Sequence, residues 1–284
     1  MKRNILSLIL ISLLTGFALV QPAQAVVPPP DGSYPGGNTA EGQDALLHLS
    51  TGVHNTAVGF LSLKTDTTGS YNTAIGSGTL RANRSDANTA TGTFALLNNT
   101  GGRQNTANGA LALLSNTSGN VNTAVGYSAL VSNTVGFQNT AIGDSTLGSN
   151  TTGNNNTASG SAALSNNTTG DGNTATGFGA LYNNGTGGGN TAVGYSALSV
   201  NQSGIVNIAL GFHAGDLTTG DNNIVIGSRG VQGESNTIRI GGGVFGFGPQ
   251  TAAFIAGING TAVVGDAVVV DGNGQLGKIG RAHV

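Results

Sequence analysis

The sequence contains no cysteine and no tryptophan, and only 8% of its 284 residues are charged. A soluble domain ordinarily has about a quarter of its residues charged, so this composition argues against an ordinary globular enzyme. Without cysteine, no disulfide can stabilise the chain outside the cytoplasm. The net charge of −2 offers no basic face for nucleic acid. The mean hydropathy of +0.05 disfavours a charge-rich disordered chain.

A long apolar run occurs only at the N-terminus, in residues 5–20. Lys2 and Arg3 precede this run, and Ala23-Gln24-Ala25 follows it as a small-residue cleavage site. The run is short for a membrane span. We therefore expect a signal peptide over residues 1–25, export to the extracellular space or cell surface, and no integral span in the mature chain. Loss of Lys2 and Arg3 changes the net charge from −2 to −4.

A Pro/Gly-rich leader over residues 26–37 separates this segment from a repeat. The triplet Asn-Thr-Ala recurs at steps of 17 residues, with one step of 16, and degenerate copies follow at Asn207, Asn223 and Asn236. The complete copies begin at Asn38, Asn55, Asn72, Asn88, Asn105, Asn122, Asn139, Asn156, Asn173 and Asn190. One unit is N-T-A-x-G-x-x-A-L-x-x-N-x-x-G-x-x, and its positions are numbered here from the first asparagine. Such a period predicts a solenoid.

Two positions of the unit carry the structural prediction. Glycine at position 5 indicates a turn that needs positive φ or close approach of a neighbour; these turn glycines are Gly59, Gly76, Gly92, Gly109, Gly126, Gly143, Gly160, Gly177 and Gly194. Leucine at position 9 would stack into a buried ladder of Leu63, Leu80, Leu96, Leu113, Leu130, Leu147, Leu164, Leu181 and Leu198. The asparagine at position 12 suits a turn, because asparagine tolerates the left-handed conformation.

We predict an all-β fold: a parallel β-solenoid of about 12 coils over residues 38–241. Each coil has one clear strand at N-T-A-x-G and a second short strand or helical turn in the other half, which is too short for a stable helix. Like charges stacked in one column would repel, which explains the low charge. Columns of asparagine and threonine can instead hydrogen-bond along the ladder.

The repeated N-T-A-x-G resembles the head repeats of trimeric autotransporter adhesins, although those repeats are about 14 residues long. The 17-residue form is also similar to repeats of phage tail-fibre-like proteins that precede an intramolecular chaperone. This resemblance implies a left-handed β-roll and a neck-like segment over residues 242–278. It also implies a homotrimer, which a thin Ala/Leu core too small to close alone would favour.

The last residues, 279–284, depart from the pattern. Ile-Gly-Arg-Ala-His-Val is what one reading frame of a common sequencing adaptor encodes. We expect these residues to be non-native, and we expect the gene to continue into a chaperone domain that aligns the chains.

No catalytic, metal or cofactor site is predicted, so the chain is not expected to be an enzyme. The histidines lie in different contexts, the acidic residues do not recur at one position, and no phosphate-binding motif occurs. Seven aromatic residues stand near one place in the unit: Phe60, Phe94, Tyr127, Phe178, Tyr182, Tyr195 and Phe212. They are expected to pack, between chains for example, or to form a stripe on which a carbohydrate stacks.

These features favour an extracellular structural or adhesive fibre module that displays a polar Asn/Thr surface to a glycan or protein receptor. The alternatives are a tail-fibre-type receptor-binding shaft and a solenoid that binds a regular surface such as glycan or ice. The threonines at position 2 would form one rank at coil spacing. A flat array usually needs a second rank, and the residue two positions on is often valine or isoleucine.

Overall fold

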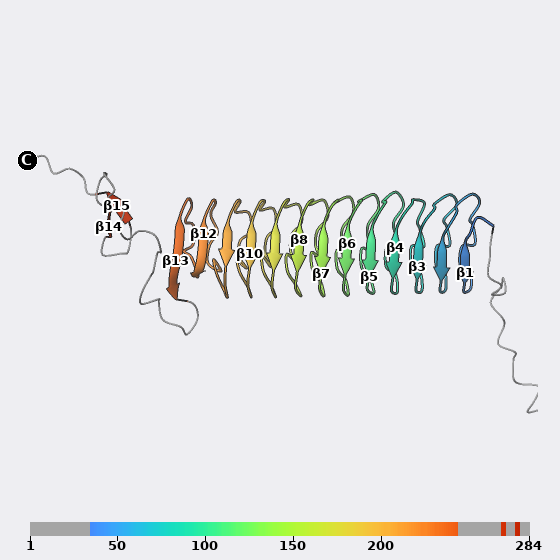
Figure 1. Ribbon diagram of the computed structural model, residues 1–284, viewed down its shortest axis with the longest axis horizontal. Coiled ribbons are helices and arrows are strands. Elements are labelled where there is room, and N and C mark those ends of the chain that lie inside the picture. Colours follow the sequence, from blue (N-terminus) through green and yellow to red (C-terminus); the bar gives the residue numbers. More distant parts are fainter. Residues whose placement is uncertain (1–34, 244–267, 271–275, 279–284) are drawn as a thin grey trace, which may run out of the picture. The chain divides into compact units, whose positions relative to one another are not determined.

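The fold is a parallel β-solenoid, as predicted. The computed structural model describes residues 35–243, 268–270 and 276–278. The chain divides into two units, Met1–Pro249 and Gln250–Val284. In the first unit every coil contributes one strand to a single sheet of 13 parallel strands, ordered β1 to β13 along the sequence (Figure 1). No helix occurs in any of the three described ranges.

The strands are short and evenly placed. Most have three residues, and only the last two of the sheet are longer. They are β1 (Thr39–Glu41), β2 (Thr56–Val58), β3 (Thr73–Ile75), β4 (Thr89–Thr91), β5 (Thr106–Asn108), β6 (Thr123–Val125), β7 (Thr140–Ile142), β8 (Thr157–Ser159), β9 (Thr174–Thr176), β10 (Thr191–Val193), β11 (Ile208–Leu210), β12 (Ile224–Ser228) and β13 (Ile238–Gly243). In the second unit β14 (Val268–Val270) pairs antiparallel with β15 (Leu276–Lys278).

The other half of each coil forms neither a second strand nor a helical turn in residues 35–243. The reason lies in the backbone of the position-9 leucines, which take positive φ angles of 49–53° from Leu63 to Leu198. Position 7 also has positive φ in coil after coil, as at Ser128 and Ser145. The left-handed conformation costs about 1–2 kcal/mol per non-glycine residue. Complete burial of a leucine is worth about 1.5–3 kcal/mol and offsets this cost.

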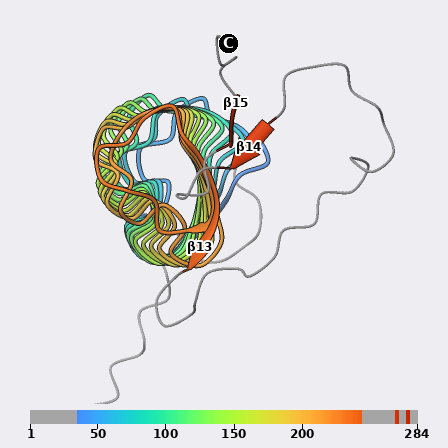
Figure 2. The ribbon, with the colours of Figure 1, turned by 90° about the vertical axis from the view of Figure 1, so that its left-hand side faces the viewer.

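The core consists of three columns of small or branched side chains. Alanine at positions 3 and 8 and leucine at position 9 are 0% exposed in most coils. Viewed along the solenoid, the coils superimpose as a closed ring (Figure 2). A single chain therefore buries this core without a partner, and the unclosed core that favoured a trimer is not observed. Any association of chains must use the outer faces.

Two further columns of the interior are asparagine. At position 1, the Asn139 backbone N–H donates to Asn122 Oδ1 (3.0 Å), and Asn139 Nδ2 donates to the carbonyl of Gly153 (2.8 Å). At position 12, Asn133 Nδ2 donates to Asn116 Oδ1 (2.9 Å). The asparagines of both columns are buried. Asparagine at position 12 bonds the backbone of the turn that follows it, as in Asn133 Nδ2 to the Gly136 carbonyl, and it also forms a buried ladder that was not predicted.

The two asparagine columns meet at the position-15 carbonyl. The Gly136 carbonyl accepts from Asn122 Nδ2 (2.8 Å) and from Asn133 Nδ2 (3.0 Å). The position-12 column starts at Asp66 and ends at Asn201, whose Oδ1 has no hydrogen-bond partner. A buried amide that lacks its bonds costs about 1–3 kcal/mol. These ladders therefore tie each coil to the next coil only in correct register.

The 16-residue coils keep this register by shortening the turn that follows position 12. Asn83 Nδ2 reaches the carbonyl of Ser85, two residues on, where Asn99 Nδ2 reaches Gly102, three residues on. Thr73 still pairs with Thr89 in the sheet. Length changes are thus absorbed in a turn and do not disturb the strand.

The final coil starts one residue later than predicted. The Thr237 backbone N–H, not that of Asn236, donates to Asn223 Oδ1 (3.1 Å), and Ile238 pairs with Ile224. Asn236 instead takes the last position of the preceding coil, with φ of 58°. Asparagine tolerates that conformation better than threonine, because threonine is β-branched.

Asp66 is a carboxyl group in the buried position-12 ladder. Its Oδ1 accepts from the Gly69 N–H (2.8 Å) and its Oδ2 accepts from Asn83 Nδ2 (2.9 Å). Burial raises the pKa of Asp66 above its ordinary 3.8, repulsion from Asp86 adds to this, and the hydrogen bonds oppose it. An acid whose folded pKa is raised favours the folded state below its unfolded pKa. That stability is lost as the pH rises through the folded pKa.

We expect Asp66→Asn to stabilise the protein more at pH 7 than near pH 4. The amide completes the ladder without a buried charge. We therefore expect the free energy of unfolding at pH 7 to rise by an amount on the order of 1 kcal/mol. Thermal unfolding at both pH values measures the effect. Asp144→Asn, at an exposed position, is the matched control. An equal gain at both pH values would contradict the role given to the Asp66 charge.

Candidate interaction surface

The outward face of the sheet is built from positions 2 and 4, because alternate residues of a strand point to opposite sides. Position 3 is the buried alanine, and its neighbours on both sides are half-buried or exposed. Threonine fills position 2 from β1 to β10 in register. Position 4 forms a second outward column, with Val58, Ile75 and Ile142 each 37–45% exposed. No charged residue occupies either column from β2 to β12.

The threonine column supplies the repeated polar element of this face. The asparagines that recur at positions 1 and 12 of the unit do not. Asparagines at positions 1 and 12 are interior, whereas the asparagines of the surface, such as Asn98 and Asn120, stand at other positions of the coil. The face combines one hydroxyl column and one mostly apolar column. From β2 to β12 it therefore repeats regularly along the solenoid without any charge.

Five of the seven aromatic residues singled out above share position 6, and Phe94 and Tyr182 stand at positions 7 and 10. Consecutive rings stack on each other: Phe178 and Tyr195 have centroids 5.3 Å apart and an interplanar angle of 14°, and Tyr195 and Phe212 are 5.4 Å apart at 26°. The facing rings of these three coils cover one another, whereas Phe60 and Tyr127 have no aromatic residue at position 6 of the adjacent coils. The aromatic residues therefore do not form a continuous stripe along the solenoid.

The titratable residues that the structure describes do not assemble a chemical site. Asp216, only 5% exposed, accepts from Arg229 Nε (2.8 Å) and Nη2 (3.0 Å), and it lies 3.0 Å from His213 Nδ1. His54 stacks on Tyr71, with centroids 5.4 Å apart. His283 lies outside the described residues. Within the described part of the chain, no group of three or more metal-binding side chains could hold a metal ion.

A hollow near the C-terminal coils has a volume of about 450 Å³. It is lined by Val200, Gln202, Ser203, Leu217, Thr219 and Gln232, and it carries no charged side chain. Nearby, Thr218 takes the place of asparagine at position 12, and its hydroxyl has no hydrogen-bond partner. The hollow thus marks where the regular ladder ends, and it lacks the convergent charged or nucleophilic groups of an active site.

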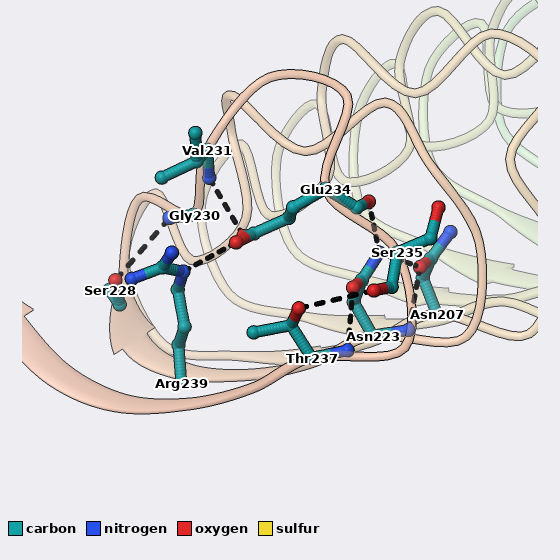
Figure 3. A network of polar contacts seen from close by, with 9 residues as sticks. All are labelled: Asn207, Asn223, Ser228, Gly230, Val231, Glu234, Ser235, Thr237 and Arg239. Atoms are coloured by element: carbon teal, nitrogen blue, oxygen red, sulfur yellow. Dashed lines mark hydrogen bonds and ion pairs between the residues drawn. The ribbon is translucent and has the colours of Figure 1, made fainter. Parts of the chain in front are cut away.

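The last coil is closed by a polar network that the repeat pattern did not indicate (Figure 3). Glu234 accepts from the Val231 N–H (2.8 Å) and from Arg239 Nε (2.6 Å), and its carbonyl accepts from Asn223 Nδ2 (2.9 Å). Glu234 thus holds a shortened turn in place and gives the asparagine ladder its last acceptor. Its sequence signal is an acidic residue at a place where the period changes.

The predicted site residues all lie within the solenoid. The nine turn glycines have φ between 121° and 143° at the end of each strand, and the nine ladder leucines are completely buried in one column. They position the outward columns. The expected signal peptide, most of the leader, most of the neck-like segment and the expected non-native tail lie outside the described residues.

Comparison of the chain with protein-family models, with curated proteins and with solved structures finds no match in any of the three. The structure also contains, over the residues it describes, no helix with the length and apolar character needed to cross a membrane.

Proposed function

We propose that the chain is an exported, non-catalytic structural and adhesive fibre module, a homotrimer in its working form. The observation that carries this proposal is the outer face of the sheet, which is uncharged from β2 to β12 and repeats the same two columns coil after coil. A regular face of this kind can make many weak contacts with a repetitive receptor. The combined affinity of such contacts far exceeds that of one contact.

A second candidate is binding to ice, and the threonine column supports it. Water molecules hydrogen-bonded at about 2.8 Å in a tetrahedral arrangement place second-neighbour oxygens about 4.5 Å apart. Neighbouring strands are about 4.8 Å apart, so threonine hydroxyls in register approach this spacing. The second outward column supplies a second rank, although it mixes valine and isoleucine with threonine, serine and asparagine.

Matched lysine variants test the outer face. We expect Thr106→Lys with Thr157→Lys to reduce binding to a glycan array at least about tenfold, because two charges interrupt the exposed column. The control, Asn98→Lys with Asn183→Lys, adds the same charge at exposed position-11 sites in the other half of the coil. The adhesive module is supported if the wild-type chain binds the array and only the Thr106→Lys, Thr157→Lys variant loses this binding.

Thermal hysteresis measured on the same three proteins separates the two candidates. Hysteresis that disappears only in the threonine variant supports ice binding instead of adhesion. A wild-type chain with neither glycan binding nor hysteresis, or equal losses in both variants, rejects the outer face as the binding surface.

A further inference from the structure

The outer face of the sheet changes character at its C-terminal end. Threonine occupies position 2 in ten successive strands, and isoleucine replaces it in β11, β12 and β13. Position 4 is also aliphatic in these three strands. The strands pair in register, Ile208 with Ile224 and Ile224 with Ile238, so the six side chains form two columns of three. We call this set the aliphatic grid: Ile208, Leu210, Ile224, Ile226, Ile238 and Ile240.

Four of the six grid residues are exposed, and Ile224 and Ile226 between them are half-buried. Ile208 and Leu210 are 43% and 49% exposed, and Ile238 and Ile240 are 68% and 75% exposed. Val206 and Phe212, 53% and 47% exposed, flank the grid on its first strand. Together these side chains present an apolar patch on the order of several hundred Å². A contiguous patch of this size marks an interaction site on a soluble protein.

We propose that the aliphatic grid is the surface through which copies of this chain associate. The proposal rests on the homotrimer of the proposed function and names its interface. Sheets pack face to face about 10 Å apart through side chains that interdigitate. The grid and its flanking residues supply several hundred Å² of apolar surface, a large share of the about 800 Å² per partner that a standard protein interface buries. It also carries no charge or polar group that a second grid would have to match.

The position of the grid explains why a second copy is the occupant. The coils from β2 to β10 are so alike that two chains could pair along their threonine faces in many registers. Only the three C-terminal coils are distinct, so two copies bury their aliphatic grids together only when the same coils lie side by side. Three copies related by an axis along the solenoid can turn their grids toward that axis with the same coils level, so one surface brings the chains together and aligns them.

The test replaces the grid with residues that the fold already accepts at the same position. The variant Ile208→Thr, Ile224→Thr, Ile238→Thr continues the threonine column of the ten preceding strands. The control Val58→Thr, Ile75→Thr, Ile142→Thr removes three exposed aliphatic residues of the same face outside the grid. Size-exclusion chromatography with light scattering gives the mass of each protein at micromolar concentration, in low and high salt.

We expect the wild type and the control to form the same multimer in both salts and the grid variant to have the mass of one chain. Circular dichroism shows whether the grid variant is folded. If it is not, Ile240→Lys decides, because this residue is 75% exposed and its substitution leaves the core intact. If the folded grid variant or Ile240→Lys remains multimeric, the grid is not the interface, whereas the proposed multimer still stands.

A monomeric wild type overturns both the grid and the homotrimer. The adhesive face is tested separately by the two pairs of lysine substitutions described above, at threonine and at asparagine positions. Failure of the adhesive face is therefore distinguishable from failure of the grid. A multimer of two chains rather than three, dissolved by the grid variant, supports the grid and corrects the proposed number of copies.

Discussion

Deleting residues 122–138 should leave a folded solenoid that is one coil shorter. Deleting residues 122–129 should instead prevent the coils around the deletion from folding and melting as one unit. The first deletion removes one complete unit and joins Val121 to Asn139, which takes the place of Asn122. Each coil contacts only its neighbours, and Asn105 Oδ1 can accept from Asn139 as it does from Asn122 (3.0 Å). We expect only a small decrease in the thermal midpoint.

The partial deletion places Leu130 where Asn122 belongs and leaves nine residues to complete a coil. It interrupts both asparagine ladders and the leucine column together. Each orphaned buried amide costs about 1–3 kcal/mol, and each leucine moved out of its column costs about 2–5 kcal/mol. Circular dichroism during heating measures both variants. Equal melting of the two deletions would show that the coils are not coupled through these columns.

The repeat made most of the solenoid predictable. The 17-residue step sets the number of coils, and alanine between threonine and a variable residue indicates a strand with one buried side chain. Position 9 is leucine in nearly every coil, which indicates an interior column of apolar side chains. These predictions succeeded because each rests on a residue whose chemistry permits one environment, repeated often enough to remove chance.

What could not be predicted depends on contacts between coils. Asparagine at position 12 has the local chemistry of a turn residue, and only the stacking of Asn116 on Asn133 shows that the side chain points inward. A left-handed leucine has no sequence signal, because the conformation is favoured only once neighbouring coils bury the side chain. The one-residue shift at Thr237 follows from a turn held by Glu234.

The candidate surface was predictable only in part. The threonine rank follows from the spacing, and strand alternation puts position 4 on the same side, but the sequence alone does not show whether that side faces inward or outward. The switch from threonine to isoleucine in β11–β13 is visible in the degenerate copies, yet its meaning requires the exposed fractions of Ile238 and Ile240. Ligand identity has no equivalent signal, since no recurring charged or nucleophilic group is present on the face.

Replacement of Gly177 by alanine should be among the most damaging single substitutions in the solenoid. A Cβ atom at Gly177 would lie 2.6 Å from the carbonyl oxygen of Gly194 and 2.7 Å from its carbonyl carbon, and φ is +124°, where residues with a side chain rarely occur. The obstacle is backbone of the next coil, which cannot rotate away. The coils must separate locally, so the coil-to-coil hydrogen bonds beside the glycine weaken as well.

We expect Gly177→Ala to lower the free energy of unfolding by more than about 4 kcal/mol, the range reached only by severe core or backbone defects. Gly185→Ala, in the same coil, is the matched control. Its Cβ would lie 3.4 Å from the Gln202 carbonyl, an ordinary contact, and its φ is not positive. Removing glycine there also restricts the unfolded chain, so this control should be neutral or slightly stabilising. Denaturant unfolding of both variants measures the difference. Similar stabilities would mean that the close approach of successive position-5 glycines does not set the distance between coils.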